Sequence, residues 1–309
     1  MALHRLLGME VGVPEPGVLD AFYNEIGFVG REGAWGSEEL PDQIRISEAP
    51  YRQLKELRVG CEGESDLAET AQRLDALGVA YQSGEGRLQV EDPLNGWRFV
   101  VEPADAHDLA PKPLRDLNLP GRRTRINRRA EATVEASPRP PRRLGHVVVG
   151  TQDVPKTFAL CQALGFRVSD TVAGIAFFMR CSRDHHNLLV TPGPVPYLNH
   201  YALEYDDTDA VLRAASLYAR NHEGVQVDGP GRHPIGGNLF WYLKDPSGTF
   251  FEHFADMDVI EDDDAWEVQE DWDPATTWSV FGSGHQSELF FNPEDMQEVI
   301  EGWSRENER

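Results

Sequence analysis

The amino-acid sequence predicts an α+β protein with two domains, each a cupped mixed sheet built from two similar units. Its 309 residues suit two domains of about 150 residues each. A Pro- and Arg-rich stretch divides the chain near its middle, and a strand–helix–strands pattern of about 50 residues recurs four times. One such unit cannot bury its own sheet, so we expect the units to pair around a shared cavity with their helices outside.

The order of the elements follows from matches between the two halves. Residues 6–28 match residues 144–166, and both segments read as a strand, a turn and a helix that ends at Gly-Phe. Residues 56–79 match residues 200–225, and both read as a strand, an acidic cap, an amphipathic helix and a terminating glycine. The first and third units therefore share one opening pattern, and the second and fourth share another.

A hairpin with an Asp-Pro turn closes each half, at residues 89–103 and 242–256. The segment 292–307 has the pattern of an amphipathic helix with a proline near its start. These limits predict four parts: an N-terminal domain at 1–106, a linker at 107–142, a C-terminal domain at 143–258, and an acidic tail with one helix at 259–309.

The charge balance disfavours nucleic acid as a partner. The net charge is -23, and such a surface repels a phosphate backbone. The short basic cluster at 121–129 lies in the linker, where we expect it to be solvated or placed between the domains. We expect the acidic run at 261–273 to be a solvated surface segment.

Targeting and redox features predict a cytoplasmic protein. The longest apolar runs are far too short to span a bilayer, and the N-terminus has no apolar core of a signal peptide. Cys61, Cys161 and Cys181 lie far apart, without the spacing of a disulfide framework or a zinc site. They fit reduced thiols.

Three polar residues on predicted strands of the second half form a candidate metal site. Alternation along a strand puts His146 on the face of Leu144, His200 on the face of Leu198, and Glu252 among phenylalanines, so all three point inward. A buried carboxylate without a partner is costly, and a shared divalent metal would relieve that cost. Two imidazoles and one carboxylate with open positions are the ligand set of non-haem Fe(II) oxygen chemistry.

The first half provides an internal control. At the matching repeat positions it carries Met9, Glu56 and Val100, which could not hold a metal in this way. Any one of the histidines, taken alone, could be a satisfied core residue, and Glu252 would face solvent if its strand slipped by one residue. The joint occurrence at equivalent repeat sites favours a metal site.

The hairpin of the fourth unit brings a tyrosine to this site. If residues 246–248 form a three-residue loop with Gly248 in the left-handed conformation, Tyr242 lies directly opposite Glu252. A two-residue loop would place Trp241 there instead. The alternative interpretation of Tyr242 is an ordinary core tyrosine.

Three further histidines are candidates for proton transfer. His233 lies on a Gly-rich loop that leads into the hairpin, although a loop histidine is often only a surface residue. His185 and His186 are adjacent on a predicted strand, so they must face opposite sides. The spacing favours His186 for the site, because it shares a face with Leu188 and Val190.

These motifs resemble those of a known family. "LGHVVVG", "DHHNLLV", "LNHYALEYDD" and "GPGRHPIGGNLFWYLKDPSGTFFEHF" are similar to motifs of the type I extradiol ring-cleaving dioxygenases of the vicinal oxygen chelate superfamily. The resemblance spans about residues 5–256, with its motifs in 144–256. It implies paired βαβββ units that form an incomplete barrel around a cavity in each domain.

The resemblance also implies an activity and residue roles. It implies cleavage of a catechol-type ring by O2 at Fe(II), with Mn(II) as the alternative, held by His146, His200 and Glu252. His186 would serve oxygen and acid–base steps, Tyr242 would hydrogen-bond the bound catecholate, and His233 would lie beside the substrate hydroxyl. We expect a small aromatic diol and O2 as partners, no nucleic acid and no membrane, and a homo-oligomer.

Two departures from the family pattern concern the substrate. Some members that cleave carboxylated catechols have an arginine where this chain has Asp228, and some have a tyrosine where it has Phe254. We therefore expect a more apolar or a larger aromatic diol. Three alternatives remain: a metal-dependent isomerase or lyase of the glyoxalase type, a non-enzymatic ligand-binding protein on the same fold, and an oxo-acid dioxygenase of the hydroxyphenylpyruvate type.

Overall fold

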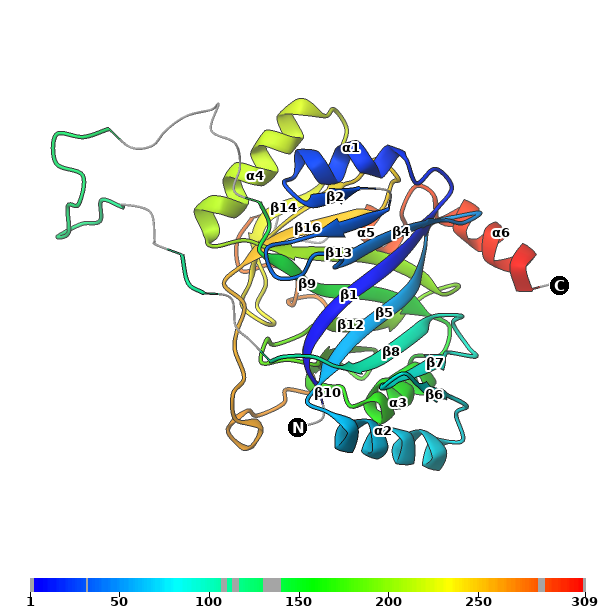
Figure 1. The fold of residues 1–309 in the computed structure, drawn as a ribbon. Helices are drawn as coiled ribbons and strands as arrows, with labels where there is room; N and C mark the ends of the chain where they lie inside the picture. Colours follow the sequence, from blue (N-terminus) through cyan, green and yellow to red (C-terminus); the bar gives the residue numbers. More distant parts are fainter. Residues whose placement is uncertain are drawn as a thin grey trace.

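The computed structural model describes residues 3–31, 33–106, 110–112, 117–129, 140–282 and 287–307. It contains two sheets of eight strands (Figure 1). The first sheet comprises β1 (Leu3–Val13), β2 (Val29–Arg31), β3 (Ala34–Gly36), β4 (Ile44–Glu48), β5 (Gln53–Cys61), β6 (Gln82–Gly84), β7 (Arg87–Glu91) and β8 (Arg98–Pro103). The second comprises β9 (Arg143–Thr151), β10 (Arg167–Val172), β11 (Ala176–Arg180), β12 (Leu188–Pro192), β13 (Tyr197–Glu204), β14 (Gln226–Arg232), β15 (Leu239–Lys244) and β16 (Phe250–Ala255).

One helix follows the first strand of each unit, which confirms the four predicted βαβββ units. The helices are α1 (Val18–Glu25), α2 (Glu64–Leu77), α3 (Val154–Leu164) and α4 (Thr208–Asn221). The tail adds a 3-10 turn, η1 (Asp263–Ala265), and the helices α5 (Glu288–Phe291) and α6 (Met296–Asn307). None of the helices among the described residues is both long enough and apolar enough to cross a bilayer.

The two sheets have the same topology. Their strand orders are β2-β3-β4-β1-β5-β8-β7-β6 and β10-β11-β12-β9-β13-β16-β15-β14. In each sheet the first strands of the paired units are antiparallel neighbours at the centre, and each is flanked by a parallel strand of its own unit. Each sheet keeps two open edges, as an incomplete barrel requires. The predicted α+β class is confirmed, while the exact domain limits stay a prediction.

A single hydrophobic core joins the two halves. Phe22 of α1 packs edge-to-face against Phe251 of β16, with ring centroids 5.0 Å apart. The Tyr23 hydroxyl donates to the Tyr201 hydroxyl at 3.2 Å, also across the two halves. In Figure 1, α1 lies beside α4 at one end of the interface and α2 lies beside α3 at the other. The opposite face of each sheet therefore points away from this core.

Bulges decide which side chains of β9 and β13 face away from the core. Leu198 pairs with Val149 and His200 with Val148, so one extra residue lies in β13. A second bulge separates His146 from Leu144 in β9. Leu144 and Leu198 belong to the shared core. The expectation that each histidine shares a face with its leucine was therefore wrong, because simple alternation fails at a bulge.

Strand pairing also corrects the repeat alignment. Met9 pairs with the first residue of β4, just as Val147 pairs with the first residue of β12. The counterpart of His146 is thus Gly8 and not Met9. A Cβ at Gly8 would lie 2.7 Å from Nη2 of Arg58, which fills this part of the first sheet. The conclusion that the first half lacks the three ligands is unchanged.

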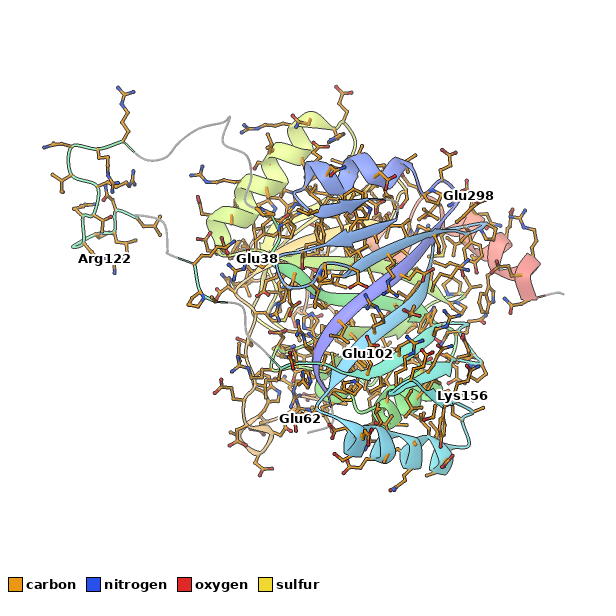
Figure 2. All side chains as sticks on the ribbon, in the orientation of Figure 1. Glu38, Glu62, Glu102, Arg122, Lys156 and Glu298 are labelled. Atoms are coloured by element: carbon orange, nitrogen blue, oxygen red, sulfur yellow. The ribbon has the colours of Figure 1, made fainter. Side chains whose placement is uncertain are left out.

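The tail lies against the second sheet and, through α6, also against the first half. Its backbone at Gln269 bridges to Asp170 of β10, and α6 packs on Tyr51 and Tyr197. Most side chains of residues 261–273 are exposed, as expected, but Trp266 and Trp272 donate their indole N–H groups to β10. The side chains of Glu62 and Lys156 lie in the lower part of the molecule in Figure 2, near α2 and α3.

Candidate metal centre

The three predicted ligands converge on the face of the second sheet that points away from the core. One ligand atom each of His146, His200 and Glu252 lies within 4.8 Å of the other two. Nε2 of His146 is 2.9 Å from Oε2 of Glu252, and Nε2 of His200 is 3.3 Å from the same oxygen. All three residues are at most 2% exposed. No fourth His, Cys, Asp or Glu joins this group in the described part of the chain.

The electrostatics of the group favour the protonation states that a metal needs. Burial lowers the pKa of His200 to about 4, so its ring is neutral at neutral pH. Burial alone would raise the pKa of Glu252, but His146 and His200 lower it overall. Nε2 of His200 is buried and makes no hydrogen bond. A buried carboxylate with a neutral imidazole whose nitrogen lacks a partner fits a divalent cation.

An asparagine and the tail fix the tautomer of His200. Oδ1 of Asn199 is 2.8 Å from Nδ1 of His200, and Nδ2 of Asn199 donates to the carbonyl of Phe290 at 2.8 Å. Because that carbonyl can only accept, the amide presents its oxygen to His200, whose Nδ1 must carry the proton. The lone pair on Nε2 is thereby directed to Glu252, which is how outer partners orient metal-binding histidines.

Glu252 and Tyr242 occupy the hairpin positions that the sequence predicts. Tyr242 pairs directly with Glu252, and Gly248 has a φ of +83°, which confirms the three-residue loop. Oε1 of Glu252 accepts from Nδ2 of Asn238, a fully buried residue, at 2.9 Å. The carboxylate therefore has one oxygen held by the protein and the other turned to the histidines.

Tyr242, His233 and the tail form a second hydrogen-bonded chain. Nδ1 of His233 donates to the carbonyl of Trp278 at 2.7 Å, so Nε2 accepts the Tyr242 hydroxyl at 2.8 Å. Burial lowers the pKa of His233 and raises that of Tyr242 well above its usual range, so both groups are neutral. The structure thus brings both predicted residues to one place.

His186 lies over the first ligand. Its ring centroid is 4.5 Å from that of His146. The neighbouring His185 points to Asp170 instead, with Nε2 of His185 3.3 Å from Oδ2 of Asp170. The prediction that these histidines alternate on a strand was wrong, because β12 begins only at Leu188. Both histidines are buried in the preceding loop. Burial, followed by the charge of His146, lowers the pKa of His186 well below its usual range.

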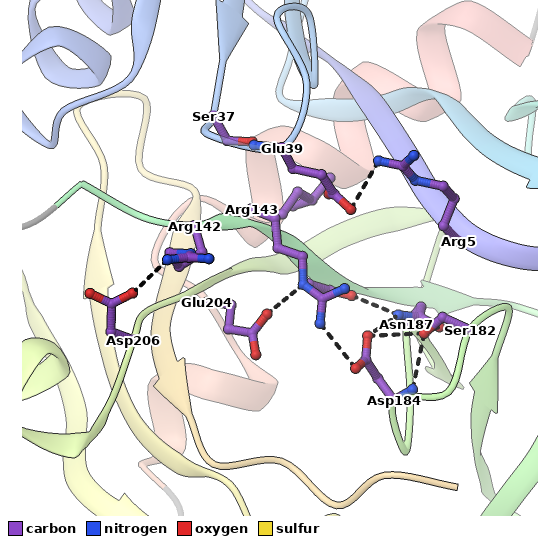
Figure 3. A network of polar contacts seen from close by, with 12 residues as sticks. Arg5, Ser37, Glu39, Arg142, Arg143, Ser182, Asp184, Asn187, Glu204 and Asp206 are labelled. Atoms are coloured by element: carbon purple, nitrogen blue, oxygen red, sulfur yellow. Dashed lines mark hydrogen bonds and ion pairs between the residues drawn. The ribbon is translucent and has the colours of Figure 1, made fainter. Parts of the chain in front are cut away.

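A polar network holds this loop in place (Figure 3). Arg143, at the start of β9, bonds to Glu204 and to Asp184, the latter at 3.0 Å. Asn187 donates to the carbonyl of Gly145 at 3.0 Å and accepts from the Ser182 hydroxyl at 3.0 Å. The loop is therefore tied to the same strand end that carries His146.

The sequence analysis missed the contribution of the tail. The ring of Phe290 lies 5.3 Å from that of His200 and 4.7 Å from that of Tyr242. The ring of Trp278 stacks on that of Tyr242, with centroids 5.7 Å apart. The indole N–H of Trp278 donates to Asp228 at 3.0 Å. Several tryptophans within a strongly acidic segment are atypical of a purely solvated surface, and this pattern could have indicated the contact.

Comparisons with known proteins agree with this architecture. The family model of the Glyoxalase/Bleomycin resistance protein/Dioxygenase superfamily matches residues 143–253. Metapyrocatechase 2 of Cupriavidus necator is 30% identical over 285 residues, which cover 86% of this chain and 85% of that protein.

A second relative and a solved structure extend the comparison. The manganese-dependent 2,3-dihydroxybiphenyl 1,2-dioxygenase of Geobacillus genomosp. 3 is 32% identical over 137 residues, or 41% of this chain and 43% of that protein. The Mn(II)-bound glyoxalase of Novosphingobium aromaticivorans has the same fold, with a TM-score of 0.72, 21% identity and 94% of each chain covered. From the match along most of its length, this chain belongs to the extradiol ring-cleaving dioxygenases of the vicinal oxygen chelate superfamily.

Proposed function

We propose that His146, His200 and Glu252 hold one divalent metal ion at which this extradiol dioxygenase opens a catechol-type ring with O2. The observation that carries the proposal is the convergence of their three buried ligand atoms within 4.8 Å. Fe(II), or Mn(II) as in the manganese-dependent relative, supplies positive charge and open positions for both reactants when it is bound. Both atoms of O2 enter the product, so the reaction needs no external reductant.

Tyr242 and His233 are placed to take a proton from the diol. The Tyr242 hydroxyl already donates to His233, so the lone pairs of its oxygen are left to accept a hydrogen bond from a substrate hydroxyl. A proton that leaves the diol then passes through this oxygen to Nε2 of His233. A neutral histidine is the right acceptor for this step.

His186 serves the other side of the centre. It is neutral, buried and in ring contact with His146, so it can accept a proton early in the reaction and return it later. Phe254, Phe290 and Trp278 surround the histidines and Tyr242 with aromatic rings that exclude water.

The residues around the centre favour an uncharged diol. Asp228 accepts the indole N–H of Trp278 and the backbone N–H of Ser287, so this position holds the tail and offers no cation to a substrate carboxylate. We expect catechol, alkylcatechols and 2,3-dihydroxybiphenyl to be cleaved better than the carboxylated diol protocatechuate. The two relatives named for catechol and dihydroxybiphenyl cleavage support this class of substrate.

Oxygen uptake tests the proposal. The protein is purified without added metal, loaded anaerobically with Fe(II) or Mn(II), and mixed with each diol in air while O2 and the yellow ring-opened product are recorded. We expect one metal ion per chain and activity in the parent, and loss of both in His146→Ala and Glu252→Ala. His222→Ala, at a partly exposed histidine paired with Glu25, is the matched control and should stay active. Metal binding without any oxygen uptake across the panel would contradict the proposed reaction.

A further inference from the structure

We infer that His185 is a positioning residue that, together with Asp170, fixes the proton of His186 on Nδ1 and leaves Nε2 as a lone pair. The role of His186 in catalysis rests on the proposed function, but the position of its proton does not. The chain of contacts runs from the tail through Asp170 and His185 to His186. Asp170 is 4% exposed, His185 is fully buried and His186 is 4% exposed.

The tail makes Asp170 an acceptor at both oxygens. The backbone N–H of Gln269 donates to Oδ1 at 2.9 Å, and the indole N–H of Trp272 donates to Oδ2 at 3.1 Å. Neither donor can accept a hydrogen bond in return, so both bonds use the oxygens of Asp170 as acceptors. Nε2 of His185 lies 3.3 Å from Oδ2, so it is this nitrogen that carries a proton and donates it.

The proton on Nε2 of His185 determines the state of its other nitrogen. If His185 is neutral, its imidazole has one N–H, and Nδ1 is then a lone pair. It lies 3.0 Å from Nδ1 of His186, and two lone pairs cannot face each other at that distance. The proton of His186 must therefore lie on its Nδ1. A cationic His185 would reverse this bond and place the His186 proton on Nε2.

The consequence for the reaction is a direction of proton flow. With Nδ1 occupied by His185, Nε2 is the nitrogen of His186 that can act, and it starts as an acceptor. The ring centroid of Trp266 lies 5.5 Å from that of His185. The tail therefore covers His185 and also supplies the two hydrogen-bond donors to Asp170. Outer partners that fix a histidine in this way typically change activity by about 10- to 100-fold when they are removed.

Nitrogen NMR tests the inference directly. Full-length protein labelled with [15N]histidine and loaded with diamagnetic Zn(II) is compared with His186→Gln, which identifies the resonances of His186. We expect a pyrrole-type Nδ1 and a pyridine-type Nε2 in the parent. In Asp170→Asn the Nε2–H tautomer should gain population, and the Fe(II) enzyme should lose about tenfold in kcat with the KM for the diol nearly unchanged.

A matched variant separates positioning from simple loosening of the loop. Asp184→Asn weakens the anchor to Arg143 in the same loop without touching the chain from Asp170 to His186. It should leave the tautomer unchanged. An Nε2–H tautomer in the parent, or equal tautomer populations in the parent and Asp170→Asn, would overturn the inference. The tautomer can be recorded in metal-free protein too, so failure of the proposed metal site would be seen separately.

Discussion

At the scale of single residues, the free nitrogen of His200 depends on a partner that touches no substrate. Asn199 accepts the Nδ1 proton of His200 and is itself oriented by the carbonyl of Phe290. Asn199→Ala should therefore weaken Fe(II) or Mn(II) binding by about 10- to 100-fold. Calorimetric titration under argon measures the affinity, and Asn221→Ala, on the exposed end of α4, is the control. Equal affinities for parent and Asn199→Ala would refute this role.

We expect Phe290 to limit the size of the diol. Its ring lies against both His200 and Tyr242, so a large substituent on a diol bound beside them would meet this ring. Phe290→Ala should raise the ratio of kcat/KM for 2,3-dihydroxybiphenyl over that for catechol by about tenfold, since each methylene is worth roughly 1–3 kcal/mol in an apolar site. Steady-state oxygen uptake measures it. Phe281→Ala, an exposed ring in the same tail, should leave the ratio unchanged.

The sequence could identify the three candidate ligands but not their protonation. His146, His200 and Glu252 could be predicted as a group because the other half lacks this set of two histidines and one carboxylate at its matching positions, where only Glu56 is polar. The tautomer of His200 depends on a contact between Asn199 and Phe290, which are 91 residues apart. No local pattern encodes such a contact.

At the scale of elements, the bulge before His146 turns this histidine away from the core. A Cβ added to Gly145 would lie 2.2 Å from Cζ of Phe254, on the strand that carries Glu252. Gly145→Ala should destabilise the protein by about 1–3 kcal/mol and reduce its metal content. Thermal unfolding and metal analysis measure both effects. Gly84→Ala, where a Cβ meets open space, is the control, and equal losses in both variants would contradict the account.

The turn between β15 and β16 makes stability depend on pH. Burial raises the pKa of Asp245 to about 6, although Ser247 and Tyr201 donate hydrogen bonds to it. The folded protein therefore holds this proton more tightly than the unfolded chain, whose carboxyl titrates near 3.8. As pH falls from above 6 towards 4, this group should make the folded state more stable relative to Asp245→Asn.

Urea unfolding of the parent and of Asp245→Asn between pH 7 and pH 4 tests the direction of this change in stability. The free energy of unfolding of the parent minus that of Asp245→Asn should rise by up to about 3 kcal/mol as the pH falls. The variant removes only this titration, so other groups cancel in the difference. If this difference in unfolding free energy decreased as the pH was lowered, or stayed constant, burial would not disfavour the carboxylate form of Asp245.

The elements themselves could be predicted to different extents. The hairpin register was predictable because Pro246 and Gly248 suit only one kind of loop, and that loop places Tyr242 opposite Glu252. The two bulges were not, because they arise where β9 pairs with β13, about 50 residues along the chain. The loop with His185 and His186 was mistaken for a strand because its apolar continuation does form β12.

At the scale of the whole molecule, the two sheets share one core and should unfold together. The contacts of Phe22 and Tyr23 with the second sheet join the halves. Calorimetry should therefore give one transition, and Fe(II) or Mn(II) should raise its midpoint because metal binds the folded state. Two transitions, of which only one responds to metal, would show that the halves unfold independently.

The two-sheet architecture could be predicted from the fourfold repeat, but the position of the tail could not. Repeats predict how units pair because each has a matching partner elsewhere in the chain. Residues 259–307 match no other segment, and the contacts of their tryptophans and of Phe290 with the second sheet become visible only in three dimensions.

The most direct test of the central claim is a crystal structure of the Fe(II)-loaded protein with data collected at the iron absorption edge. We predict a single anomalous peak within bonding distance of Nε2 of His146, Nε2 of His200 and Oε2 of Glu252. An anomalous peak elsewhere, or no peak between these three side chains in protein that contains iron, would contradict the account.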